Sequence, residues 1–124
     1  MKEVVAIIRM NKINETKRAL SDAGISSFHA RECLGRGKGL VDFNLLKGAE
    51  KGYEEAIAQL GQSQRLVPKR MISVMVIDKL VSKVIQTIIK VNQTGKPGDG
   101  KIFVMPLSSV YRVRTGEEGE EVLD

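Results

Sequence analysis

Two apolar, β-branched runs, each followed by a helical pattern, constrain the fold of this chain most strongly. They span residues 1–10 (MKEVVAIIRM) and 71–77 (MISVMVI). Runs of this length and composition predict mostly buried strands. Apolar residues at helical spacing then predict a helix over about 15–23 after the first run and another over about 79–92 after the second.

Each predicted helix is followed by a further extended stretch, at 26–34 and at 101–106. The order strand–helix–strand therefore occurs twice, which is the split βαβ pattern of a ferredoxin-like α+β fold. At 124 residues, the chain is expected to form a single domain over 1–124. An apolar content of 42% with 28% charged residues is ordinary for a soluble globular protein.

The expected compartment is the cytoplasm. The sequence contains neither an apolar run of about 18 residues nor a signal-peptide pattern, so no membrane span or secretory signal is expected. The one cysteine, Cys33, cannot form an internal disulfide, which fits a reducing environment. A net charge of +5 suits anionic ligands. Because aromatic residues make up only 4% and the basic residues are scattered, a nucleic-acid-binding surface is not expected.

A long excursion, over about 36–67, separates the second and third predicted strands. It opens on a basic, glycine-rich stretch, GRGKG at 35–39, and a short amphipathic helix is predicted over about 49–60. Long loops in small domains are usually functional or disordered, so a partner-contacting loop is favoured over a passively disordered one. The last residues, 117–124, are acidic and are expected to form a mobile or partner-docked tail.

The stretch TGKPGDGK at 94–101 joins the second predicted helix to the last predicted strand. Its three glycines allow positive φ and close approach to a ligand. Pro97 stiffens the loop and leaves the remaining N–H groups free to point outward, and two lysines flank the turn. Such a loop suits a phosphate group. The alternative is an ordinary helix-to-strand turn, and the residue order of a Walker motif is missing.

A second cluster follows at 111–117 (YRVRTGE). Its two arginines, Arg112 and Arg114, are predicted to lie on an extended segment and therefore to point to one face. Together, TGKPGDGKIFV at 94–104 and RVRTGEEGE at 112–120 resemble the nitrogen-regulatory PII signal-transduction family. The resemblance extends over nearly the whole chain, with the long loop as the main exception.

The resemblance implies a homotrimer of ferredoxin-like subunits that binds ATP or ADP in clefts between subunits. It further implies that 2-oxoglutarate binds together with ATP and Mg²⁺. Carried over to matching positions, the nucleotide-binding residues are Gly35, Gly37, Lys38, Gly98, Asp99, Gly100, Lys101, Arg112 and Arg114. The two arginines would reach the phosphates across the subunit interface. The residues implied for 2-oxoglutarate are Lys69, Gly37 and Lys38, and no catalytic residue or protein metal ligand is implied.

Two positions depart from the family pattern. Many relatives read G-R-Q-K-G where this chain reads GRGKG at 35–39, so the glutamine that helps to hold Mg²⁺ and 2-oxoglutarate is absent. Either 2-oxoglutarate is held differently, with Lys38 or Arg36 helping, or it binds weakly. Leu46 stands where many relatives carry a modifiable tyrosine, which excludes uridylylation there. With its longer loop, the chain resembles the nitrogenase-associated subgroup of the family.

The resemblance implies a nitrogen- and energy-status sensor whose long T-loop acts on a target protein, expected to be nitrogenase. The assembly would be a homotrimer or a mixed complex with a PII paralogue. The alternative is an adenylate-only regulator of an ammonium transporter or a nitrogen-assimilation enzyme. An enzyme with His29 as nucleophile is disfavoured because no second acid or base accompanies it in a recognisable pattern.

Overall fold

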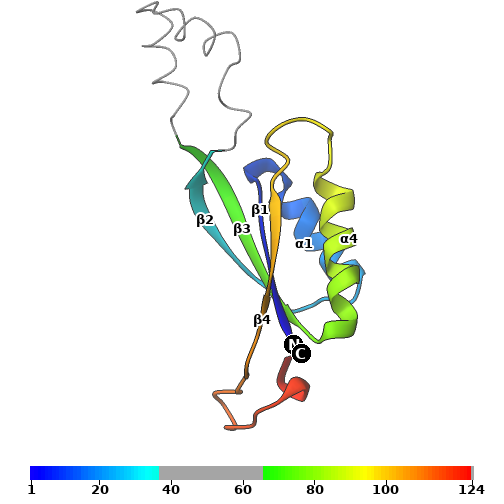
Figure 1. The fold of residues 1–124 in the computed structure, drawn as a ribbon, viewed down its shortest axis with the longest axis vertical. Coiled ribbons are helices and arrows are strands. Elements are labelled where there is room, and N and C mark those ends of the chain that lie inside the picture. The colour runs from blue at the N-terminus through cyan, green and yellow to red at the C-terminus, as the bar shows by residue number, and fades with distance from the viewer. Residues whose placement is uncertain (37–65, 124) are drawn as a thin grey trace, which may run out of the picture.

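The computed structural model describes residues 1–36 and 66–123 of the chain (Figure 1). Its regular elements, in chain order, are β1 (Lys2–Arg9), η1 (Met10–Lys12), α1 (Ile13–Asp22), β2 (His29–Gly35), β3 (Val67–Val76), η3 (Asp78–Leu80), α4 (Val81–Asn92), β4 (Lys101–Pro106) and η4 (Glu120–Leu123). The prediction of a helix over 49–60 and most of the predicted excursion fall outside the described residues.

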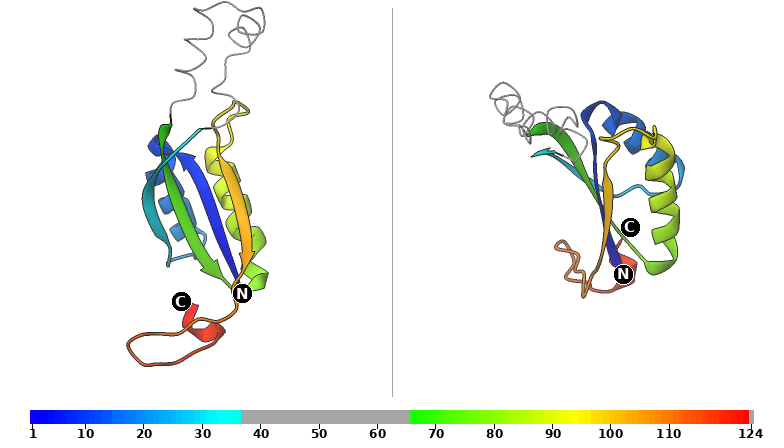
Figure 2. Two further views of the ribbon diagram at one scale, coloured as in Figure 1. Left: turned by 60° about the vertical axis from the view of Figure 1, so that its left-hand side comes forward. Right: turned by 45° about the horizontal axis from the view of Figure 1, so that its top comes forward.

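The four strands form one antiparallel sheet in the order β2-β3-β1-β4. Both α-helices cover the same face of this sheet and contact each other (Figure 2). This order, with two helices on one face, is the ferredoxin-like α+β arrangement that the repeated strand–helix–strand pattern predicted. The predicted fold class is therefore confirmed.

The core lies between the sheet and the helices, and the two-residue period of the strands decides which side chains enter it. The residues of β1 that point to the helices are Val4, Ala6 and Ile8, and those of β3 are Ile72, Val74 and Val76, all buried. Leu20 from α1, Ile25 after it, and Val84 and Ile88 from α4 complete the cluster. Apolar residues at helical spacing therefore pack onto alternate residues of the strands.

The opposite face of the sheet is the helix-free face. Over it runs a groove of about 580 Å³, lined by Glu3, Val5, His29, Ala30, Arg31, Met71, Ser73, Met75 and Met105. No other described element covers this face, and Phe103 and Met105 of β4 are 49% and 39% exposed on it. A sheet with one face on the core normally carries polar residues on the other. Here the uncovered face also carries apolar residues, among them Met71, Met75, Phe103 and Met105.

Strand β3 is longer than its sequence pattern indicated. The strand was expected to begin at Met71, but it begins at Val67 and includes Pro68, Lys69 and Arg70. These residues are extended because all of them pair with β2, and Lys69 and Arg70 also pair with the end of β1. Tertiary pairing, rather than local propensity, sets where the strand begins.

The segment that carries Arg112 and Arg114 is a closed turn, so the prediction of an extended segment is wrong. The N–H of Gly116 donates to the carbonyl oxygen of Arg112 at 2.7 Å, and the N–H of Arg112 donates to that of Glu117 at 2.7 Å. Gly116 supplies the positive φ of 74° that the turn requires. Further on, part of the predicted acidic tail forms η4, whose Leu123 borders a cavity of about 120 Å³ beside Ile25.

Candidate functional site

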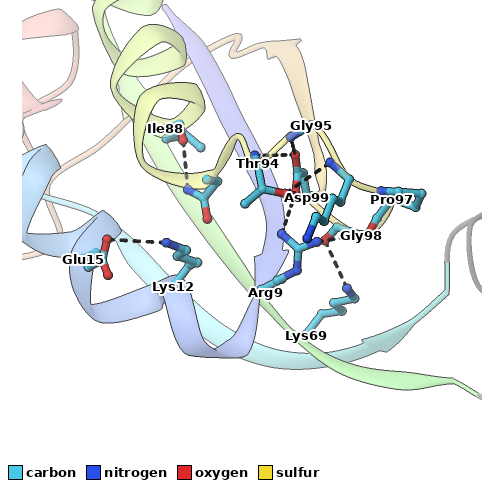
Figure 3. A network of polar contacts seen from close by, with 12 residues as sticks. Arg9, Lys12, Glu15, Lys69, Ile88, Thr94, Gly95, Pro97, Gly98 and Asp99 are labelled. Atoms are coloured by element: carbon cyan, nitrogen blue, oxygen red, sulfur yellow. Dashed lines mark hydrogen bonds and ion pairs between the residues drawn. The ribbon is translucent and has the colours of Figure 1, made fainter.

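The loop between α4 and β4 is built around the carboxylate of Asp99 (Figure 3). This carboxylate accepts hydrogen bonds from the backbone N–H of Thr94 at 2.7 Å, from its hydroxyl at 2.5 Å, and from the N–H of Gly95 at 3.0 Å. Asp99, near the end of the loop, is thus hydrogen-bonded to residues 94 and 95 at its beginning. A short polar side chain that accepts from nearby N–H groups stabilises a turn in this way.

A second set of contacts comes from the end of β1. Arg9 places Nη1 2.6 Å from Oδ1 of Asp99, and its Nη2 donates to the carbonyl oxygen of Pro97 at 3.0 Å. Hydrogen bonds from the hydroxyl and then the N–H of Thr94, followed by the one from Arg9, hold the pKa of Asp99 well below its usual range. The carboxylate is therefore ionised at neutral pH.

The prediction that loop N–H groups point outward toward a phosphate is wrong for the first half of the loop. The N–H groups of Thr94 and Gly95 are taken by Asp99, and that of Lys96 donates to the Thr94 hydroxyl at 3.2 Å. The loop's own carboxylate occupies the place expected for an external anion. Anion binding would therefore depend on the second half of the loop and on nearby cationic side chains.

Two glycines in that second half are required by geometry. Gly100 has a φ of 114°, and a Cβ there would lie 2.0 Å from the carbonyl oxygen of Ile7. Gly98 has a φ of 99°, and its Cβ would lie 3.2 Å from Nη2 of Arg9. Both positions combine positive φ with close approach of another group, which only glycine tolerates without strain.

The structure brings Lys69 and the predicted site residues of the turn at 98–101 together at one end of the sheet. Nζ of Lys69 donates to the carbonyl oxygen of Gly98 at 3.4 Å, and Lys69 is paired with Arg9 across β3 and β1. Lys101 is paired with Ile7, two residues before Arg9. Because paired and i, i+2 residues share a face of a sheet, Arg9, Lys69 and Lys101 all lie on the helix-free face.

Of the other described site residues, Gly35 lies near this group and the two C-terminal arginines lie far from it. Gly35 ends β2 opposite Val67, two residues from Lys69 on β3, whereas Gly37 and Lys38 lie outside the described residues. The far end of β4 lies roughly 17 Å from Lys101 along the strand. Arg112 and Arg114 come after that end. Arg112 pairs with Glu117 at 3.2 Å. Within one chain, the arginines and the loop at 94–101 are at opposite ends of the subunit.

In 1–36 and 66–123, no group of three or more His, Cys, Asp or Glu side chains is arranged to hold a metal ion. None of the helices in those ranges is both long and apolar enough to span a bilayer.

Comparison with known proteins connects this architecture to a family. The family model described as Nitrogen regulatory protein P-II matches residues 1–117. The chain belongs to the P-II family. A relative from Methanobacterium ivanovii, named nitrogen fixation nifHD region GlnB-like protein 2, is 46% identical over 99% of both chains. A protein of the same name from Methanothermobacter marburgensis is 42% identical over 99% of this chain and all of its own.

A solved P-II structure agrees with the fold. The crystal structure of Arabidopsis thaliana PII bound to citrate superposes with a TM-score of 0.73 at 32% identity, covering 98% of this chain and 88% of that one. The expected resemblance to P-II proteins, and to the nitrogenase-associated subgroup in particular, is confirmed by these relatives. The P-II family is one of nitrogen regulatory proteins.

Two residues of the loop network were not singled out from the sequence. Arg9 contacts Asp99 from 90 positions away, and Thr94 binds the same carboxylate from five positions away. The Thr94 contact carried a local signal, since a threonine and an aspartate bracketing a glycine-rich turn favour such hydrogen bonds. Arg9 carried no such signal, because only the β1–β4 pairing brings it to the loop.

Proposed function

We propose that this P-II protein is a sensor that binds ATP or ADP between subunits and regulates a target protein through its long loop. The proposal depends on one observation above all. The turn at 98–101 is fixed in place beside three cationic side chains, Arg9, Lys69 and Lys101, at one edge of the helix-free face. A glycine turn bordered by cations suits a polyphosphate better than a neutral ligand.

The phosphates would lie on Gly98, the backbone of Asp99, Gly100 and Lys101, with Lys101 as the principal cation of that turn. Arg112 and Arg114 would supply further charge from a neighbouring copy of the chain. Their position beyond the far end of β4 supports this arrangement, since one chain does not bring them to the loop. Charge-assisted hydrogen bonds of this kind are worth about 1.5–3 kcal/mol each, so two arginines could raise the affinity for a triphosphate strongly.

The helix-free face supports assembly into a trimer or into a mixed complex with a P-II paralogue. An uncovered sheet face with exposed apolar residues such as Phe103 and Met105 is typical of a protein–protein interface. The cations at its edge would then lie at the junction between subunits, where a nucleotide could be bound by both. Gly35, which ends β2 near Lys69, would lie at the base of this cleft together with Gly37 and Lys38.

A carboxylate effector is the second part of the proposal. We assign 2-oxoglutarate to Lys69, with Gly37 and Lys38, in the presence of ATP and Mg²⁺. Two facts support a small carboxylate: the ammonium of Lys69 lies beside the proposed phosphate turn, and the Arabidopsis P-II structure was solved with citrate bound. The effector would shift the long loop between two states only by its difference in affinity for them. Mg²⁺ would be held by the ligands themselves rather than by a protein cluster.

The names of the relatives favour nitrogenase as the target, since those proteins are named for the nifHD region. The alternative is an adenylate-only regulator of an ammonium transporter or a nitrogen-assimilation enzyme. It is favoured by the glycine at position 37, where many family members carry a glutamine that helps to hold Mg²⁺ and 2-oxoglutarate. The two functions differ in whether 2-oxoglutarate binds at all.

Calorimetric titration distinguishes the 2-oxoglutarate sensor from the adenylate-only regulator. ATP, ADP and 2-oxoglutarate are titrated into the purified protein, the last with and without Mg-ATP. We expect ATP to bind, and 2-oxoglutarate to bind only in its presence. Heat from ATP with none from 2-oxoglutarate would support the adenylate-only alternative. Absence of binding by ATP and ADP at millimolar concentration would refute both functions.

A further inference from the structure

The turn at 98–101 is held from outside the loop by two strands. Arg9 at the end of β1 binds both Asp99 and the carbonyl oxygen of Pro97, and Lys69 of β3 binds the carbonyl oxygen of Gly98. The Arg9 guanidinium and the Asp99 carboxylate are each about one-quarter exposed, so the pair is largely shielded from water. These contacts join residues 29 to 90 positions apart in the sequence.

The loop needs such support because its own backbone is permissive. Gly95, Gly98 and Gly100 all have positive φ. Glycine loses more conformational freedom on ordering than any other residue, so a loop with three of them is costly to fix in one conformation. If the loop is already ordered before the ligand binds, this entropic cost does not weaken the binding free energy.

We propose that Arg9 is a positioning residue, which acts on nucleotide affinity through Asp99 and not by touching the ligand. This inference rests on the proposed nucleotide site. The geometry supports an indirect role, since both terminal nitrogens of Arg9 donate within the loop, one to Asp99 at 2.6 Å and the other to Pro97 at 3.0 Å. Asp99 likewise directs its two oxygens inward, at Arg9, Thr94 and Gly95, so it organises the loop instead of receiving a ligand.

The fork shape of the guanidinium matters for this role. Arginine presents its five N–H donors in a rigid planar fork and can bind a carboxylate and a carbonyl oxygen at once, whereas the lysine ammonium acts as one point charge. The two contacts of Arg9, with Asp99 and with the carbonyl oxygen of Pro97, form a clamp on the turn. Arg9→Lys should therefore keep the charge near the turn and lose one of these two contacts. A direct ligand contact would depend chiefly on the charge, so this variant distinguishes the two roles.

A double-mutant cycle tests the proposal. ATP affinity is measured for wild type, Arg9→Met, Asp99→Asn and the double variant. If loss of the clamp leaves the loop competent one time in ten, each single variant binds ATP about tenfold more weakly. The double variant should be no weaker than the weaker single one, because both changes break the same contact. Losses that multiply, or an Arg9→Met variant with unchanged affinity, would overturn the proposal.

Two controls accompany the cycle. Arg18→Met removes an exposed arginine of α1 and should leave ATP affinity unchanged. Arg9→Lys should bind nearly as weakly as Arg9→Met if the fork is what matters. An Arg9→Lys variant with wild-type affinity would instead indicate that charge near the ligand is the essential property.

Amide hydrogen exchange in the nucleotide-free protein makes the test independent of the proposed function. The N–H groups of Thr94 and Gly95 should exchange slowly in wild type and about tenfold faster in Arg9→Met. Equal exchange in the two proteins would overturn the positioning role even if ATP binds. Slow exchange that is lost in Arg9→Met, together with no ATP binding by wild type, would retain the clamp and refute the nucleotide site.

Discussion

Gly100 is the residue at which the backbone allows least change. A Cβ there would lie 2.0 Å from the carbonyl oxygen of Ile7, and the φ of 114° disfavours any other residue. We expect Gly100→Ala to lower the free energy of unfolding by at least about 2 kcal/mol, measured by urea denaturation. It should also weaken ATP binding, since the turn has to move.

Gly95→Ala is the matched control. Gly95 also has a positive φ, 83°, but nothing lies within 4 Å of the Cβ position. Only the left-handed backbone penalty, about 1–2 kcal/mol, should apply. If the two variants were equally stable, close approach to Ile7 would not be what requires glycine at position 100.

Asp99 should make the free energy of unfolding depend measurably on pH in the acid range. Its folded-state pKa is lowered, chiefly by the hydroxyl and N–H of Thr94 and then by Arg9. A carboxylate with a lowered pKa contributes stability that is present above its unfolded pKa, about 3.9, and is lost as the pH falls through the folded-state value. Asp99→Asn removes this contribution.

Urea denaturation between pH 7 and pH 3 measures the contribution of Asp99 to the free energy of unfolding. The stability difference between wild type and Asp99→Asn should be constant above about pH 5 and should shrink below about pH 4, as protonation of the unfolded chain begins to compete. Comparison of the two proteins cancels the contribution of Asp78, whose pKa is also lowered by its contacts with the N-terminus and Lys2. A difference independent of pH would show that Asp99 acts without its charge.

At the scale of elements, one buried polar contact joins the two helices. Nδ2 of Asn92 in α4 donates to Oγ1 of Thr16 in α1 at 3.1 Å and to the carbonyl oxygen of Ile88 at 2.9 Å. Both side chains are buried, at 5% and 0% exposure. Within the described part of the chain, Oδ1 of Asn92 accepts no hydrogen bond. The contact therefore fixes how α1 and α4 are aligned, at some cost in stability.

We expect Thr16→Val to destabilise the protein by about 1–3 kcal/mol, because it leaves one Asn92 N–H without its partner. In an Asn92→Leu background the same change should cost less than about 1 kcal/mol, since no polar group remains unpaired. The cavity of about 280 Å³ beside Asn92 offers space for the leucine. Thermal or urea unfolding of the four proteins gives the coupling, and additive costs would rule out the contact as a stabilising unit.

The sequence predicted the elements well and their connections less well. Strands and helices were predictable because β-branched runs and helical spacing agreed with the core positions that they occupy, such as Val4, Ile72 and Val84. The four residues Val67–Arg70 were missed because their extension depends on pairing with two other strands. Arg112 and Arg114 lie in a turn and not in the predicted extended segment, because the hydrogen bond from Gly116 to Arg112 that closes the turn has no clear signal in the sequence.

The sequence predicted part of the candidate site but not the contacts that hold its loop in place. The glycine turn and Lys69 were identified, and the structure places them in contact. The inward direction of the Thr94 and Gly95 N–H groups does not follow from the sequence, because an aspartate in a glycine-rich loop can equally face a ligand or its own backbone. Contacts such as Arg9–Asp99 join residues far apart in the sequence, and only the sheet register makes them visible.

At the scale of the whole molecule, the helix-free face connects the proposed site to the proposed assembly. The cations Arg9, Lys69 and Lys101 lie at one edge of that face, and Phe103 and Met105 lie along β4 toward the segment that carries the two C-terminal arginines. A neighbouring copy packed on this face could bring its Arg112 to the turn at 98–101. Assembly and nucleotide binding should therefore depend on the same surface.

Phe103→Glu tests that dependence. It places a charge at a residue that is 49% exposed and is paired with Val5 on the helix-free face. If this face is buried between copies, an unpaired carboxylate there should dissociate the assembly, because burying a lone charge costs far more than an apolar contact contributes. Light scattering coupled to size-exclusion chromatography should then report the mass of one chain.

The control is Gln86→Glu, which adds the same charge at an exposed position of α4 on the other side of the sheet. It should leave the oligomeric mass and the ATP affinity unchanged. In Phe103→Glu, by contrast, ATP affinity should fall together with the mass, because Arg112 and Arg114 would no longer be supplied by a neighbour. A monomeric Phe103→Glu protein that still binds ATP as tightly as wild type would mean that one chain contains the whole nucleotide site.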